Sequence, residues 1–294
     1  MNVLLTGASS FVGAHVALSL IPNHTVWGCY FSTPLAYAGV KPYRIDLRKK
    51  RALDTLDDLP IDVVVHVACK IKARPTTEDE SPAAAAWREN RQLMDTVLAL
   101  QKPVVYASST VVHWTRDIPY RHSRQEDEQR LMDSGLPYAI LRPSAPYGPR
   151  LLQHRPGHQE SFHTLANWVR YSPVVPVIGN GKYRRQPVHV HDFAAAIAAL
   201  LEHPLPNKAF DVGGGTAHSF NELIGIMKAH CRRSTLRMPL PKWAIVRLAA
   251  YLPDFDPSLL DAVDEDELAD PTALSALTGV RFRGFQEGVL DVFR

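Results

Sequence analysis

The fold is decided by residues 3–13, Val-Leu-Leu-Thr-Gly-Ala-Ser-Ser-Phe-Val-Gly, where a short apolar strand passes through a glycine turn into a helix. A pyrophosphate at such a turn gains from free backbone N–H groups and from the positive end of the helix. Gly7 permits the tight turn, and Gly13 lets the helix pack closely on the strand. Ser10 stands where a G-x-x-G-x-x-G pattern has its middle glycine, which impairs close approach to the backbone. We expect phosphate contacts at Gly7, Ser9, Ser10, Phe11, Val12 and Gly13.

Strands and helices alternate outward from this turn. Apolar runs predict strands at residues 3–5, 25–30, 43–46, 61–68, 103–107 and 138–141, and helices are expected at 11–20, 83–100 and 125–134. This alternation favours an α/β fold, a Rossmann-type doubly wound parallel sheet with a smaller C-terminal α/β substrate lobe. We expect residues 1–150 to bind the dinucleotide, with return segments from about 175–225, and residues 151–294 to form mainly the substrate-binding lobe.

Bulk composition excludes several classes of protein. The 294 residues are 46% hydrophobic and carry 33 basic and 30 acidic side chains, so the net charge of +3 predicts no nucleic-acid partner. Three scattered cysteines (Cys29, Cys69 and Cys231) predict neither a disulfide framework nor a zinc site. We see no signal peptide and no apolar run of roughly 18 residues. A reducing cytoplasm and no membrane span are therefore expected.

Motifs in a fixed order resemble the extended short-chain dehydrogenase/reductases, the NAD(P)-dependent epimerase/dehydratase group. After the glycine turn come Asp46 within Ile-Asp-Leu, the D-x-V-x-H-x-A strand of residues 62–68, and Asn90. They are followed by the Ser-Ser pair at 108–109, the Y-x-x-S pattern that begins at Tyr120, the L-R-P and Y-G-P segments of residues 141–149, and Arg185 before a V-x-D pattern. The resemblance covers residues 1 to about 225.

The resemblance implies a bound dinucleotide, NAD or NADP. The implied contacts beyond the turn are Tyr30, Ser32, Asp46, Leu47, Val67, Ala68, Cys69, Asn90, Ala107 and Pro143. An acidic residue at the end of the second strand would chelate the ribose hydroxyls and favour NAD. Residues 30–32 are Tyr-Phe-Ser, and no strong cation follows until Lys41, so we expect only a slight preference for NADP.

Tyr120, Ser109 and Arg124 are the catalytic residues that the resemblance implies. Tyr120 would move the proton while nicotinamide moves the hydride, and Ser109 would hold the substrate oxygen. Arg124 stands where the family has Lys; it keeps the positive charge that lowers the pKa of the phenol, but its planar guanidinium is larger. Arg124 could substitute for Lys, or could point elsewhere in a protein without turnover. Alternatively, His113 or His122 could supply the catalytic group.

The resemblance implies that Ser109, Thr110, Ala145 and Arg185 bind the substrate. Arg185 would clamp the diphosphate of a nucleotide sugar, a task that suits a guanidinium. The favoured function is an NAD(P)-dependent epimerase or oxidoreductase acting on such a substrate, as a possible homodimer. A reductase of a non-sugar carbonyl compound and a non-catalytic scaffold stay open. A dehydratase is disfavoured, because no Asp-Glu pair follows Ser109.

The chain has 13 histidines, and His189-Val-His191 invites a metal hypothesis. On a strand, His189 and His191 would share one face. The family pattern already accounts for this segment, so we predict no metal. We expect His154, His158 and His163 in a substrate-covering loop, and an amphipathic helix at residues 241–252.

Overall fold

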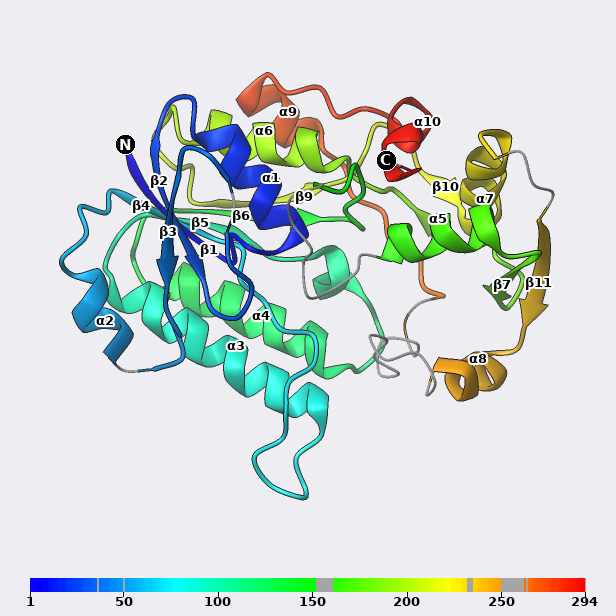
Figure 1. The fold of residues 1–294 in the computed structure, drawn as a ribbon, viewed down its shortest axis with the longest axis horizontal. Coiled ribbons are helices and arrows are strands. Elements are labelled where there is room, and N and C mark those ends of the chain that lie inside the picture. Colours follow the sequence, from blue (N-terminus) through cyan, green and yellow to red (C-terminus); the bar gives the residue numbers. More distant parts are fainter. Residues whose placement is uncertain are drawn as a thin grey trace.

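Seven parallel strands form the central sheet in the order β3-β2-β1-β4-β5-β6-β9 (Figure 1). The computed structural model describes residues 1–35, 37–49, 51–151, 161–231, 235–249, 262 and 264–293. The strands are β1 Asn2–Thr6, β2 Thr25–Tyr30, β3 Val40–Arg44, β4 Val63–His66, β5 Val104–Ala107, β6 Tyr138–Pro143 and β9 Lys208–Val212. The order reverses between β1 and β4, which is the doubly wound topology that the sequence predicts.

Both faces of the sheet are covered by helices. The helices α1 Phe11–Leu20, α6 Val190–Leu200 and α9 Thr272–Thr278 lie on one face, and α2 Arg51–Leu56, α3 Pro82–Ala99 and α4 Pro119–Asp133 lie on the other. Alternate residues of β1 serve the two layers, because Val3 and Leu5 pack toward α1 whereas Leu4 packs toward α3. Because the strands are buried on both faces of the sheet, their sequences are continuous apolar runs.

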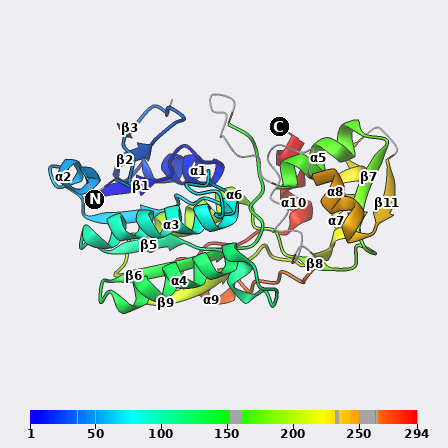
Figure 2. The same cartoon turned by 90° about the horizontal axis from the view of Figure 1, so that it is seen from below.

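A smaller lobe lies beyond the carboxyl ends of the strands (Figures 1 and 2). Its strands pair as β7 Val174–Ile178 with β11 Leu236–Leu240, and β8 Arg184–Arg185 with β10 His218–Ser219. Its helices are α5 Ser161–Tyr171, α7 Phe220–Ala229, α8 Lys242–Ala249 and α10 Phe285–Gly288, and its 3-10 turn is η3 Val289–Phe293. The other 3-10 turn, η1 Thr110–His113, follows β5 and packs against α4. Phe162, Val175, Leu223 and Phe285 belong to its separate core.

Several predicted elements differ from the structure, and the strand predicted at 61–68 is the shorter β4 Val63–His66. The third strand is Val40–Arg44 rather than 43–46, and α4 begins at Pro119 rather than at residue 125. Proline suits the first helical position because its missing N–H would be unpaired there. The strand predicted through His189 is wrong, because His189 is the N-cap of α6 and its ring accepts a hydrogen bond from the backbone N–H of His191. Residues 250–252 of the predicted amphipathic helix lie outside the described residues, as do His154 and His158.

Candidate active site

The glycine turn has the backbone geometry that a phosphate-binding turn needs. Gly7 has a φ of +67°, and a Cβ there would lie 2.6 Å from the backbone nitrogen of Ala68. A Cβ on Gly13 would lie 2.1 Å from the carbonyl oxygen of Gly7. Ser10 is the N-cap of α1, and its Oγ accepts a hydrogen bond from the N–H of Gly13 at 3.0 Å. The serine thus stabilises the start of the helix, a contact that a glycine could not make.

A cation that the sequence motifs did not reveal lies at the end of β2. The guanidinium of Arg48 lies 5.1 Å from the centre of the Phe31 ring. It also donates to both carboxylate oxygens of Asp46, at 2.7 and 2.9 Å, and to Glu89 at 2.7 Å. Tyr30 of β2 pairs with Arg44 of β3, and this pairing brings the residues after Arg44 beside Phe31. The motifs missed Arg48 because they do not show which strands pair.

Arg48 also engages Asp46, one of the predicted dinucleotide contacts. The backbone N–H of Arg48 donates to Asp46 Oδ1 at 3.1 Å, so both side chain and backbone of Arg48 contact this carboxylate. These hydrogen bonds, foremost those from the Arg48 side chain, lower the pKa of Asp46. The neighbouring Leu47 is buried, whereas Ser32, which follows Phe31, is exposed.

The loop after β4 is held by buried side chains. Thr6 Oγ1 accepts from the N–H groups of Val67 and Ala68, each at 3.2 Å, and lies 2.7 Å from Nδ1 of His66. Asn90 Oδ1 accepts from the N–H of Lys70 at 2.8 Å, and its amide donates to the Lys70 carbonyl at 2.8 Å and to Ser123 Oγ at 3.1 Å.

Asn90 therefore ties this loop to α4 and positions its neighbours. These hydrogen bonds engage both its amide oxygen and its amide nitrogen with protein atoms, which makes it a positioning residue for the predicted dinucleotide site. Ala107 and Pro143, at the ends of β5 and β6, are both buried at the same edge of the sheet.

Tyr120 lies in the first turn of α4, with its phenol beside two predicted site residues. The Tyr120 hydroxyl lies 3.9 Å from Cys69 Sγ, and the side chain of Ser109 acts on the pKa of the same phenol. Burial raises the pKa of Tyr120, and the neighbouring Cys69 raises it further, whereas Arg124 and Ser109 lower it. At neutral pH the Tyr120 side chain is therefore a protonated phenol, which is the form that can donate a proton to a carbonyl oxygen.

Arg124 is buried beneath the predicted site and is not directed to solvent. It is only 1% exposed, and its guanidinium lies 5.6 Å from the ring centres of both Tyr106 and Tyr120. Its Nη2 donates to Asp127 at 2.9 Å. Within the described residues, its Nε and Nη1 have no hydrogen-bond partner. Two buried donors next to the candidate proton donor fit the hydroxyls of a ribose.

A chain of charged side chains fixes α4 to the sheet. Glu128 accepts from Ser108 Oγ at 2.6 Å and from Nη2 of Arg142 at 2.6 Å. Arg142 also pairs with Asp211 at 3.4 Å, and Asp211 lies 2.9 Å from Nε2 of His113. Ser108 precedes Ser109, and Glu128 follows Tyr120 by about two helical turns, so this chain links the two segments that carry Ser109 and Tyr120.

Two of the predicted substrate residues, Thr110 and Arg185, meet at a glutamate that the sequence motifs do not include. Thr110 Oγ1 donates to Glu267 Oε1 at 2.6 Å, and Arg185 Nε lies 3.4 Å from Glu267 Oε2. Ala145 lies after β6 with a φ of +33°, and packs against the core of the smaller lobe. Glu267 was missed because it is distant from Arg185 in the sequence, and only the bridge between these two residues brings it to the site.

The histidines gather without forming a metal centre among the residues that the structure describes. The rings of His15 and His191 lie 4.9 Å apart, those of His189 and His191 lie 5.0 Å apart, and Phe11 contacts both His15 and His163. Burial lowers the pKa of His15 and of His189 to about 4. His163 lies in α5, where its Nε2 lies 2.9 Å from the Gly148 carbonyl oxygen, so it is a packed residue of a helix rather than part of a loop.

Several known proteins that are similar to this chain are named as nucleotide-sugar enzymes. The family model described as NAD dependent epimerase/dehydratase family matches residues 3–213. The uncharacterized UDP-glucose epimerase YtcB of Bacillus subtilis is 24% identical over 88% of this chain and 93% of its own. A putative UDP-glucose 4-epimerase of Methanocaldococcus jannaschii is 25% identical over 77% of this chain and 81% of its own.

Solved structures share the fold over the whole chain. The UDP-glucuronic acid 4-epimerase of Bacillus cereus, in complex with UDP-glucuronic acid and NAD, has a TM-score of 0.76 at 19% identity and covers 100% of this chain and 98% of its own. The UDP-glucose 4-epimerase of Thermus thermophilus, in complex with NAD, has a TM-score of 0.76 at 22% identity with the same coverage. Family match, sheet order and glycine turn agree, and the chain belongs to the NAD dependent epimerase/dehydratase family.

Proposed function

We propose that this protein is an NAD(P)-dependent oxidoreductase or epimerase in which Tyr120 exchanges a proton with the substrate oxygen. The observation that carries the proposal is the position of Tyr120 at the carboxyl edge of the parallel sheet, where the buried guanidinium of Arg124 lies 5.6 Å from its ring centre. When bound, the dinucleotide supplies the hydride acceptor or donor. Ser109 orients the substrate oxygen, and Tyr120 gives or takes its proton. Arg124 holds a positive charge beside the phenol, which lowers its pKa against the effect of burial.

The residues around the predicted dinucleotide fit that group. Gly7, Ser10 and Gly13 form the turn for the pyrophosphate, and the two donors of Arg124 that have no partner within the described residues fit ribose hydroxyls. The slight preference for NADP belongs to the same proposal, because Tyr30 leaves no carboxylate at the end of β2 to repel a 2′-phosphate. Calorimetric titration with both dinucleotides tests it, and tighter binding of NAD contradicts it.

Nucleotide sugars are the first substrate class to be tested, because the named relatives and solved structures are UDP-sugar epimerases. The second candidate is a carbonyl compound without a diphosphate, and the pairing of Arg185 with Glu267 favours it. A cytoplasmic homodimer stays a prediction. None of the helices that the structure describes is long and apolar enough to cross a membrane.

The test compares wild type, Tyr120→Phe and Arg124→Lys with UDP-sugars and with uncharged hydroxy-carbonyl compounds. Tyr120→Phe should slow turnover by about 10²- to 10⁴-fold, because the proton donor is lost, while dinucleotide affinity stays within about threefold. Arg124→Lys keeps the charge and should keep measurable turnover. Full activity in Tyr120→Phe would sink the assignment, and a wild type that binds dinucleotide but turns over no substrate would point to a non-catalytic scaffold.

A further inference from the structure

Arg185 is the predicted phosphate ligand, yet its guanidinium is already engaged by the protein. It is 7% exposed, and Nη1 donates to the carbonyl oxygen of Arg184 at 3.0 Å and to the carbonyl oxygen of Glu265. Nε lies 3.4 Å from the carboxylate of Glu267. The guanidinium lies over the ring of Tyr183, 4.9 Å from its centre. An incoming phosphoryl group would have to displace contacts with carbonyl and carboxylate oxygens.

Glu267 lies at the reacting end of the site. Its other oxygen accepts a hydrogen bond from the hydroxyl of Thr110 at 2.6 Å, and Thr110 directly follows Ser109, the predicted ligand of the substrate oxygen. Glu267 is 9% exposed and forms the bridge that aligns it with Arg185. The Glu267 carboxylate thus neutralises Arg185 and also holds Thr110, the residue next to Ser109.

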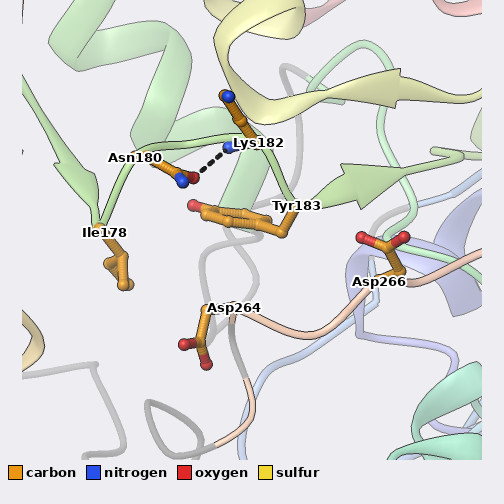
Figure 3. Close-up of a pocket in the computed structure, with 7 residues that line it drawn as sticks. Ile178, Asn180, Lys182, Tyr183, Asp264 and Asp266 are labelled. Atoms are coloured by element: carbon orange, nitrogen blue, oxygen red, sulfur yellow. Dashed lines mark hydrogen bonds between the residues drawn. The ribbon is translucent and has the colours of Figure 1, made fainter.

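The cavity beside Arg185 is also lined by carboxylates. It has a volume of about 410 Å³ and is lined by Ile178, Gly179, Asn180, Lys182, Tyr183, Asp264 and Asp266. Figure 3 shows Asp264 on one side of the Tyr183 ring and the Lys182 side chain pointing away on the other. Asp264 pairs with Lys242 at 3.4 Å, and Asp266 accepts a hydrogen bond from the backbone N–H of Arg184 at 2.7 Å. Each carboxylate retains acceptor capacity for hydroxyls, so an aromatic ring between such acceptors suits a hydroxyl-bearing group.

We propose that Glu267 is the residue that selects the substrate: by neutralising Arg185 it makes the pocket accept an uncharged, hydroxyl-bearing group and disfavour a diphosphate. The inference rests on the proposed function for the identity of the pocket, and it chooses the second of the two substrate classes. Removal of the Glu267 charge leaves the Arg185 guanidinium buried without a carboxylate beside it. An anionic ligand would then supply the missing negative charge.

The experiment is calorimetric titration of the NAD-saturated protein with UDP, and with uridine as the matched ligand without phosphates. Wild type should bind UDP no more tightly than uridine. Glu267→Gln keeps an acceptor for Thr110 and should bind UDP about tenfold more tightly or better, with no gain for uridine. Arg185→Met in the Glu267→Gln background should abolish the gain.

Glu265→Gln is the control, because it removes the same charge from the same segment. Its carboxylate accepts instead from the backbone N–H groups of Thr115 and Arg116, at 2.7 and 2.9 Å. An equal gain in this variant, no gain in Glu267→Gln, or micromolar UDP binding by wild type would each overturn the inference. If Glu267→Gln fails to fold, the comparison of UDP with uridine in wild type decides.

These binding measurements are independent of turnover. Loss of the proposed chemistry would appear as an inactive wild type with unchanged ligand selectivity. Failure of the inference would appear as tight UDP binding whether or not the protein turns over.

Discussion

Replacing Arg124 by methionine should destabilise the protein strongly, because it leaves the carboxylate of Asp127 buried without its cation. The two side chains are 1% and 3% exposed, and Nη2 lies 2.9 Å from Oδ2. Unit charges at this distance attract by about 6 kcal/mol with an effective dielectric constant of about 20. The desolvation of both groups offsets much of this, so the free energy of unfolding should fall by about 3–5 kcal/mol.

The matched variant is Arg124→Met with Asp127→Asn. The amide that replaces the Asp127 carboxylate would still accept from the Tyr106 hydroxyl, which lies 3.2 Å from Asp127 Oδ2, but it carries no charge. We expect the double variant to recover most of the loss, ending within about 1–2 kcal/mol of wild type. Urea unfolding, followed by far-ultraviolet circular dichroism, measures both free energies.

The cost of Arg124→Met should also depend on pH. Burial raises the pKa of Asp127 from its ordinary value of 3.8, and Arg124 opposes that rise. Without Arg124 the pKa rises further, so the folded variant binds a proton more readily than the unfolded chain and loses stability as pH rises above 3.8. The gap between variant and wild type should therefore shrink on acidification. A cost below about 1 kcal/mol at neutral pH, or no recovery in the double variant, would refute the reasoning.

Three further predictions concern other parts of the molecule. Gly13→Ala places a methyl 2.1 Å from the carbonyl oxygen of Gly7, and should abolish dinucleotide binding in a titration. The control is Gly135→Ala, which has open space around its Cβ but a φ of +73°, and which should at most lower stability. Burial lowers the pKa of His15 to about 4, so wild type should lose stability as pH falls from 6.5 toward 4, and His15→Gln should show a flatter profile in thermal denaturation. Phe285→Ala, in the core of the smaller lobe, should cost about 3–5 kcal/mol by urea unfolding, and a cost below about 1 kcal/mol would show that this core is loosely packed.

Much of the fold was predictable because its signals are local. The helix Phe11–Leu20 and the strand Thr25–Tyr30 have the predicted bounds, and the apolar runs of β4 and β5 follow from burial on both faces. The start of α4 was misplaced because Pro119 and Tyr120 precede a polar stretch with no apolar periodicity. His189 was assigned to a strand because alternation over three residues cannot separate a strand from a helix N-cap.

The sequence by itself determined the family and the glycine turn, because these depend on ordered motifs whose residue types are tied to their chemistry, and it predicted Tyr120 and Ser109 as catalytic partners. Only the tertiary structure decided what surrounds the cations. Arg124 proved to be buried with Asp127, Arg48 proved to lie over Phe31, and Arg185 proved to be paired with Glu267. The electrostatic effect of a guanidinium depends on which carboxylate lies within a few ångströms, and the contacts of Arg48 with Glu89 and of Arg185 with Glu267 join distant segments that meet only in the folded chain.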